Sequence, residues 1–208
     1  MLLKVCGMTQ GSQIEELDQK GIADLIGFIF YEPSPRSVRN ASFDLQNAHK
    51  VGVFVNATFD EILDKVIAFR LDYVQLHGGE EPELCRALRT HTKIIKAFRI
   101  QDRMDHAELG TFEPYCDLFL FDTHTPNYGG SGMRFDWELL KDYRGDVPFL
   151  LSGGIDPESL EELRHFQHPK FHGIDINSRF EVNPGVKDIK LIQQFKKELS
   201  YENFIQTR

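Results

Sequence analysis

The sequence predicts an α/β protein that folds as a single (β/α)8 TIM barrel over residues 1–208. Two observations carry this prediction: short apolar, β-rich runs recur at fairly even spacing, and amphipathic helical stretches separate them. Strands that alternate with helices form βαβ units around a parallel sheet. The length agrees, because 208 residues suffice for one such barrel with a core that needs no disulfides or metals.

Eight runs have the composition of strands, and eight parallel strands close a barrel. They are residues 2–6, 24–30, 51–55, 72–77, 93–98, 117–121, 147–152 and 171–176. An open flavodoxin-like sheet is the competing architecture, but such a sheet normally has about five or six strands.

Helical periodicity is clearest in FDEILDKVIAF, residues 59–69, where apolar residues recur at spacings of three and four. EEPELCRALRTH and DPESLEELRHF show the same pattern, and Thr58 and Asp156 stand where helix N-caps are expected. The fifth crossover, residues 101–117, has only a weak helical pattern. We therefore expect an irregular fifth crossover.

Charge and cysteine content narrow the functional classes. The formal net charge is −8 and no cluster of Lys and Arg stands out, so nucleic acid is not an expected partner. Cys6, Cys85 and Cys116 form no C-x-x-C pair, which favours reduced thiols in a cytoplasmic protein. No signal peptide is evident, and the apolar runs are too short to cross a bilayer, so no membrane partner is expected.

The opening run LLKVC places two polar side chains on one face of a strand. Alternate residues of a strand point the same way, so Lys4 and Cys6 share the face opposite Leu3 and Val5. In a barrel, one strand face packs on the helices and the other fills the lumen. We expect Leu3 and Val5 to face the helices and Lys4 and Cys6 to face the lumen, with Cys6 at the end where barrels have active sites.

Polar and glycine residues also end or follow other predicted strands. Each has an ordinary structural explanation, since a strand cysteine is usually a small buried hydrophobic residue and an Asp, His or Gly often shapes a turn. An Arg in a loop is often a solvated charge. In a barrel, however, all these positions meet at one mouth. The residues are Cys6, Arg36, Gln75, His77, Asp122, Gly129, Gly130, Gly132, Ser152, Gly153, Gly154, Asp175 and Asn177.

Two of these strand ends predict a phosphate site. SGG, residues 152–154, ends the seventh strand, and INS, residues 176–178, ends the eighth. Glycine lets backbone amides approach an anion closely, and the loops after strands seven and eight of barrels often bind phosphate. The pairing favours a phosphorylated small-molecule ligand.

Together these segments resemble the phosphoribosylanthranilate isomerases, which are enzymes of tryptophan biosynthesis. The resemblance covers nearly the whole chain in order, through KVCGMT, GFIFYEPSPRSV, VGVFVN, VQLHGGE, FDTHTPNYGGSGMRFDW, LLSGGI and NPGVKD. It implies a (β/α)8 barrel, monomeric or homodimeric, that uses no cofactor and no metal. It also implies an Amadori rearrangement of N-(5-phosphoribosyl)anthranilate to 1-(2-carboxyphenylamino)-1-deoxyribulose 5-phosphate.

The resemblance also assigns roles to matching residues. Cys6 would be the general base, Asp122 the general acid and Arg36 the group that holds the anthranilate carboxylate, with the glycine loops on the phosphate. The expected substrate-binding residues are Arg36, His77, Gly130, Gly153, Gly154, Asp175, Asn177 and Ser178. One position departs from the family: Arg179 replaces the usual glycine, and its backbone is expected to differ because Arg disfavours positive φ.

Three further expectations follow from the barrel and the reaction. Lys4 should pair with Asp175, because the first and eighth strands are neighbours and a buried Lys needs a partner. A dry setting should keep Asp122 protonated, so that it can act as an acid. Residues 123–134 form a long, glycine-bearing loop and are expected to act as a lid.

Alternative functions are distinguished by single features. The histidine-pathway isomerase performs the same chemistry with a pair of aspartates, whereas the first strand here ends in Cys6. Indole-glycerol-phosphate synthase would need a catalytic lysine pair and a longer N-terminal extension. A barrel that only binds a phosphorylated metabolite would need neither Cys6 nor Asp122.

Overall fold

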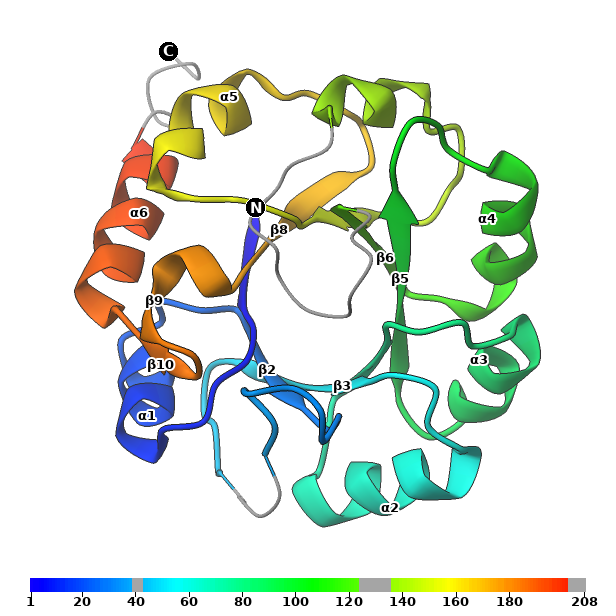
Figure 1. The fold of residues 1–208 in the computed structure, drawn as a ribbon, viewed down its shortest axis with the longest axis horizontal. Helices are drawn as coiled ribbons and strands as arrows, with labels where there is room; N and C mark the ends of the chain where they lie inside the picture. The colour runs from blue at the N-terminus through cyan, green and yellow to red at the C-terminus, as the bar shows by residue number, and fades with distance from the viewer. Residues whose placement is uncertain (39–42, 124–135, 202–208) are drawn as a thin grey trace.

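The computed structural model of the protein describes residues 1–38, 43–123 and 136–201. Eight parallel strands follow one another around a closed barrel, and the last pairs with the first (Figure 1). The predicted fold class is therefore confirmed. The strands are β1 (Leu2–Val5), β2 (Leu25–Ile29), β3 (His49–Phe54), β4 (Tyr73–Leu76), β5 (Lys93–Ile100), β6 (Leu118–Thr123), β7 (Phe149–Leu151) and β8 (Phe171–Ile176).

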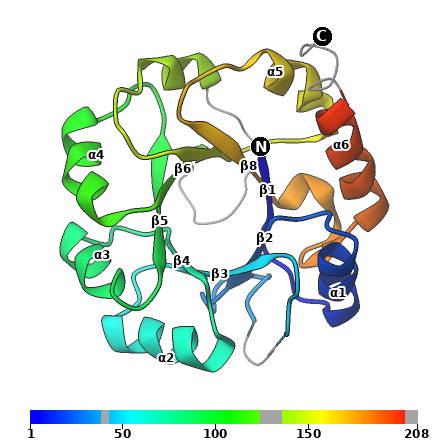
Figure 2. The ribbon, with the colours of Figure 1, turned by 180° about the vertical axis from the view of Figure 1, so that it is seen from behind.

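The α-helices form an outer ring around the strands, as both views of the ribbon show (Figures 1 and 2). They are α1 (Gly11–Gln19), α2 (Phe59–Phe69), α3 (Pro82–Leu88), α4 (His106–Phe112), α5 (Leu160–His165) and α6 (Ile189–Tyr201). Short 3-10 segments lie at Glu113–Tyr115, Trp137–Asp142, Pro157–Ser159 and Ser178–Phe180. A small antiparallel pair, β9 (Glu181–Asn183) and β10 (Val186–Lys187), lies between β8 and α6 along the chain.

Helix α2 shows how local sequence sets these elements. Thr58 caps its N-terminus in a reciprocal capping box with Glu61, and Arg70 ends it in the left-handed conformation. Its apolar positions turn inward, so that Ile62 and Val66 are buried against the barrel. The sequence-predicted range, 59–69, and the observed helix coincide.

The fifth crossover is more regular than expected. It contains α4, which Asp105 caps by accepting hydrogen bonds from the backbone N–H groups of Ala107 and Glu108. Within the described residues, the second and sixth crossovers are the ones that carry no α-helix. The end of the second is held instead by the buried Asp18 carboxylate, which accepts three backbone N–H groups from residues 46–48.

Two hydrophobic clusters occupy the two faces of the barrel wall. Leu3 and Val5 belong to the outer cluster, which includes helix residues, and Cys6 belongs to the inner one. The predicted faces of the first strand are therefore confirmed. The inner cluster consists of Cys6, Leu25, Val51, Val53, Ile95, Ala97, Leu118, Leu120 and Leu150.

Strand β6 extends further than the sequence indicated. The prediction ended it at residue 121, but the strand continues to Thr123 and pairs with β5 along this extension. Asp122 is thus a residue of β6, opposite Arg99 of β5, and not the first residue of a turn. On the inward-facing alternation set by Leu118 and Leu120, its side chain points toward the mouth of the barrel.

Candidate active site

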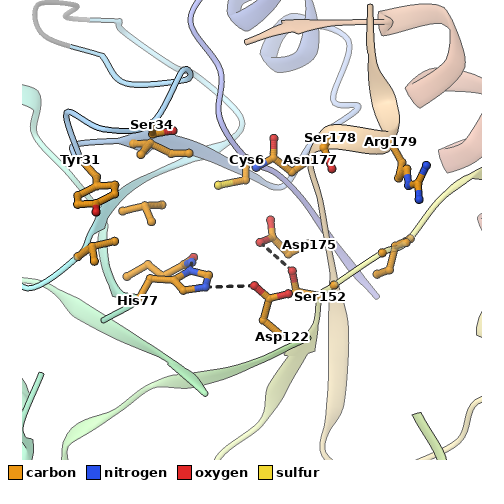
Figure 3. A pocket seen from close by; sticks show the side chains of 17 residues that line it. Cys6, Tyr31, Ser34, His77, Asp122, Ser152, Asp175, Asn177, Ser178 and Arg179 are labelled. Carbon is orange, nitrogen blue, oxygen red and sulfur yellow. Dashed lines mark hydrogen bonds and ion pairs between the residues drawn. The ribbon is translucent and has the colours of Figure 1, made fainter. Parts of the chain in front are cut away.

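A cavity opens at the C-terminal ends of the barrel strands, where parallel barrels carry their active sites (Figure 3). Seven of the eight strands or their following loops contribute to its wall. Its lining residues are Cys6, Ile29, Tyr31, Ser34, Val53, Val55, Gln75, His77, Asp122, Ser152, Gly153, Gly154, Ile155, Asp175, Asn177, Ser178 and Arg179. The cavity therefore joins Cys6 to Asp122, the two residues expected to carry the chemistry.

Cys6 is buried at the base of this cavity, directly after β1. Space for its sulfur depends on Gly27 of β2, because a Cβ at that position would lie 2.9 Å from Cys6 Sγ and 3.2 Å from Lys4 Nζ. Burial raises the pKa of the Cys6 thiol, and Lys4 and Lys187 oppose that effect only in part. The thiolate is thus disfavoured by desolvation and assisted by two nearby ammonium groups.

Lys4 forms an ion pair with Asp175 inside the barrel. The two residues are register partners on β1 and β8, and Lys4 Nζ lies 2.8 Å from Asp175 Oδ1. Burial by itself would lower the pKa of Lys4. Asp175 and Cys6 raise it by more than burial lowers it, so the pKa lies above its ordinary value and the ammonium keeps its proton. The predicted pairing of Lys4 with Asp175 is confirmed.

Asp122 contacts His77 across the cavity. His77 Nε2 lies 3.1 Å from Asp122 Oδ2 (Figure 3). On the other side of the ring, His77 Nδ1 lies 2.8 Å from Nε2 of Gln75. The Asp122 side chain is 25% exposed, so its surroundings are more polar and wetter than the dry setting that we expected. His77 lies at the site, and in this structure its direct partners there are Gln75 and Asp122.

The loops after β7 and β8 meet at the other side of the cavity. Gly153 and Gly154 have φ angles of 83° and 72°, values that glycine adopts without strain. Asn177 and Ser178 line the same wall. Arg179 lies in the 3-10 turn Ser178–Phe180 and is not among the positive-φ residues, so the turn accommodates its side chain.

Arg36 lies beside the cavity and is not among its lining residues. Its Nε and Nη2 groups donate to Glu181, with the shortest contact at 2.7 Å, and Lys187 Nζ donates to Glu181 at the same distance. Burial lowers the pKa of Lys187, and Glu181 counteracts that effect. Gly7 permits this arrangement, because a Cβ there would lie 2.7 Å from the Arg36 side chain.

Several residues of the site were not assigned from the sequence. Tyr31 and Ser34 follow β2 in the loop that also contains Arg36, and their position at a strand end was the available signal. Lys187 lies in NPGVKD, a segment that carried the family resemblance, and Glu181 lies two residues before that segment, but no local pattern linked either of them to Arg36. Gly130 and all but the first residue of the expected lid, 123–134, lie outside the described residues.

The described part of the chain has neither a cluster of metal-ligating side chains nor a helix that could span a membrane. Within residues 1–38, 43–123 and 136–201, no three His, Cys, Asp or Glu side chains gather as metal ligands would. Over the same ranges, no helix has both the length and the apolar character needed to cross a membrane. That the reaction needs no metal or cofactor stays a prediction.

Comparison with known proteins supplies the family. The family model described as N-(5'-phosphoribosyl)anthranilate (PRA) isomerase matches residues 3–198. The chain belongs to the N-(5'-phosphoribosyl)anthranilate isomerase family. A family member from Parabacteroides distasonis is 46% identical over 207 residues, covering 96% of this chain and 93% of that protein.

Solved structures of this family have the same fold. The phosphoribosyl anthranilate isomerase of Thermotoga maritima is 32% identical, covers 97% of this chain and 99% of its own, and superposes with a TM-score of 0.80. A second structure, 29% identical with a TM-score of 0.76, covers 97% of this chain and 100% of its own. That family member is in complex with reduced 1-(o-carboxyphenylamino)-1-deoxyribulose 5-phosphate.

Proposed function

We propose that this protein is the phosphoribosylanthranilate isomerase of tryptophan biosynthesis. It converts N-(5-phosphoribosyl)anthranilate to 1-(2-carboxyphenylamino)-1-deoxyribulose 5-phosphate, with Cys6 as general base and Asp122 as general acid. The observation that carries this proposal is the single cavity lined by Cys6, Asp122 and the glycine loop after β7. Membership of the family supports the same substrate.

The first step opens the furanose ring. Asp122 gives a proton to the ring oxygen, the bond from that oxygen to C1′ breaks, and the nitrogen lone pair forms a C=N bond. A general acid must reach into the cavity, and the Asp122 side chain lines it from β6. His77, 3.1 Å away, holds the carboxyl group in place during this step.

The second step removes the proton from C2′, which the neighbouring iminium makes acidic. The Cys6 thiolate takes this proton, and the electron pair forms the C1′=C2′ bond of an enolamine, which tautomerises to the ketone. Lys4 and Lys187 assist the thiolate, since both lower the pKa of Cys6. Gly27 keeps the sulfur accessible by leaving room beside β1.

The anionic ends of the substrate have separate partners. The Nη1 group of Arg36 makes no hydrogen bond within the described residues, while Glu181 holds the other side of the guanidinium. This leaves one edge of Arg36 for the anthranilate carboxylate. Gly153, Gly154 and Ser178 line the wall on which the phosphate would rest.

A direct assay tests the proposal. Wild-type protein should convert freshly made phosphoribosylanthranilate, whose fluorescence falls on conversion. Cys6→Ser and Asp122→Asn should each reduce kcat by about 10²-fold or more, the loss expected for a general base or acid. Cys116→Ser and Asp60→Asn, which lie away from the cavity, serve as matched controls. Wild-type protein that binds the substrate without converting it would indicate a binding barrel and contradict the proposal.

A further inference from the structure

The amide of Gln75 occupies an unusual position in this cavity. Gln75 lies on β4, is 0% exposed and points into the lumen, where its Nε2 lies 2.8 Å from His77 Nδ1. Its Oε1 is also buried and has no hydrogen-bond partner in the described structure. A buried acceptor without a partner is costly, so the group requires an explanation.

The observed contact determines the tautomer of His77. An amide nitrogen is only a donor, so the Nδ1 atom that faces it must present its lone pair. Neutral His77 then carries its proton on Nε2 and donates it to the Asp122 carboxylate at 3.1 Å. In this arrangement the His77–Asp122 pair lacks the proton that a general acid must deliver, and we call it the unloaded pair.

The loaded pair has one more proton and needs a different partner at Nδ1. The proton can form an imidazolium beside a carboxylate, or a neutral ring with its proton on Nδ1 beside a protonated Asp122. In both forms Nδ1 carries a hydrogen and requires an acceptor. Rotation of the Gln75 amide by about 180° supplies one, because it places Oε1 where Nε2 stands in this structure.

We propose that Gln75 is a positioning residue whose amide turns over with the proton load of the His77–Asp122 pair, donating to His77 in the unloaded pair and accepting from it in the loaded pair. This inference rests on the proposed function, because it takes Asp122 as the general acid that delivers this proton to the substrate. A glutamine suits the position because its amide offers a donor and an acceptor in the same shape. The Oε1 atom that has no partner here is the acceptor that the loaded pair requires.

Other charged groups also face the pair and must stay constant in any test. They are Cys6 after β1, Arg99 of β5 beside Asp122 in register, and Asp175 of β8. The Lys96–Glu80 ion pair binds the backbone of Gly78, the residue after His77, and must stay constant as well. Substitutions confined to Gln75 leave all of them in place, so the comparison among Gln75 variants isolates the amide.

Long-range ¹H–¹⁵N correlation spectra of the full-length protein without ligand test the proposal, because they show which ring nitrogen carries a proton. His77→Asn identifies the His77 signals. At high pH, the wild-type ring should carry its proton on Nε2. A proton on Nδ1 under these conditions would overturn the proposal, whatever the variants do.

Two substitutions should move the midpoint of the His77 titration in opposite directions. Gln75→Glu offers only an acceptor when ionised, so it favours the loaded pair and moves the midpoint to higher pH. Gln75→Met offers neither group, and a hydrogen bond to a charged ring is worth more than one to a neutral ring, so its loss disfavours the loaded pair more and moves the midpoint to lower pH. Gln75→Leu replaces Gln75→Met if the latter does not fold, and Gln194→Met on the surface of α6 is the control. Shifts in the same direction, or none, would contradict the proposal.

Kinetics provide an independent readout. Both variants should lower kcat by about tenfold or more while KM changes little, because each supports only one state or neither state of the pair. If Asp122→Asn retains full activity, the proposed function fails, yet the spectra still report whether Gln75 controls His77. If Asp122→Asn is inactive and the Gln75 variants keep wild-type kcat, the proposed function stands and this inference fails.

Discussion

Lys4 Nζ lies 2.8 Å from Asp175 Oδ1, and this ion pair is enclosed between β1 and β8 at the wall of the barrel. The side chain of Lys4 is 0% exposed and that of Asp175 is 5% exposed. When one charge of such a buried pair is removed, the other stays buried without a counter-charge, and this is strongly destabilising. The pair also stands next to Cys6, so it links the stability of the barrel to the chemistry at its mouth.

Removal of one partner of this pair should destabilise the fold. Lys4→Met leaves Asp175 buried without its counter-charge, so we expect the free energy of unfolding to fall by about 3–5 kcal/mol. Lys4→Met/Asp175→Leu, which removes both charges, should recover much of this loss. Urea denaturation measures both. Lys20→Met, which breaks an exposed pair with Glu16, is the control and should change stability by less than about 1 kcal/mol. A single variant as stable as this control would contradict the prediction.

The thiol of Cys6 should titrate above the range of a free cysteine. Burial raises its pKa, so we expect a midpoint above about 8.5, the ordinary value. The difference in thiolate absorbance between wild type and Cys6→Ser measures this midpoint directly. Lys4→Met should move it higher still, since the Lys4 ammonium is the largest influence that favours the thiolate. A midpoint below about 8 would mean that the nearby ammonium groups outweigh burial.

Gly27→Ala should impair catalysis more than folding. The added methyl group would lie 2.9 Å from Cys6 Sγ, so the sulfur or β1 must shift. We expect kcat to fall by about tenfold or more, and overpacking to cost about 1–3 kcal/mol of stability. The matched control is Gly110→Ala on α4, where nothing lies within 4 Å of the new methyl group. Equal activities of the two variants would show that Gly27 has no role at the site.

Glu181→Gln tests how Arg36 is held. Glu181 accepts from both Nε and Nη2 of Arg36, and the neutral amide of Gln cannot accept from both in this way. If Arg36 binds the anthranilate carboxylate, KM should rise by about tenfold with little change in kcat. Arg36→Lys, which keeps the charge but not the planar fork, should have a similar effect. An unchanged KM in both variants would separate Arg36 from substrate binding.

Much of the architecture could be read from the sequence. The eight strand segments, the capped helix α2 and the two faces of β1 all follow from patterns within a few residues. The Lys4–Asp175 pair followed from one topological step, since closure of a barrel makes the first and last strands neighbours. The helix in the fifth crossover was the least evident from the sequence, because a weak apolar pattern obscured the N-cap signal of Asp105 with Glu108.

The site was predictable only in part. Cys6 and Asp122 were predicted to meet because polar residues at strand ends converge in a barrel, and both do line one cavity. The contact of His77 with Asp122 was not predicted, because it depends on the distance across the mouth between β4 and β6. Likewise, Arg36 and Glu181 are 145 positions apart, and nothing in either segment indicates that they pair.

Short-range periodicity was therefore sufficient for the barrel, its strand order and the residues at its mouth, because alternation and helical spacing belong to segments of a few residues. Closure of the barrel set the rest. It enclosed Lys4 with Asp175, placed Gln75 behind His77 and turned Arg36 toward Glu181. These are distances between side chains from different strands and loops, and they exist only once eight strands have taken up one curvature and one register.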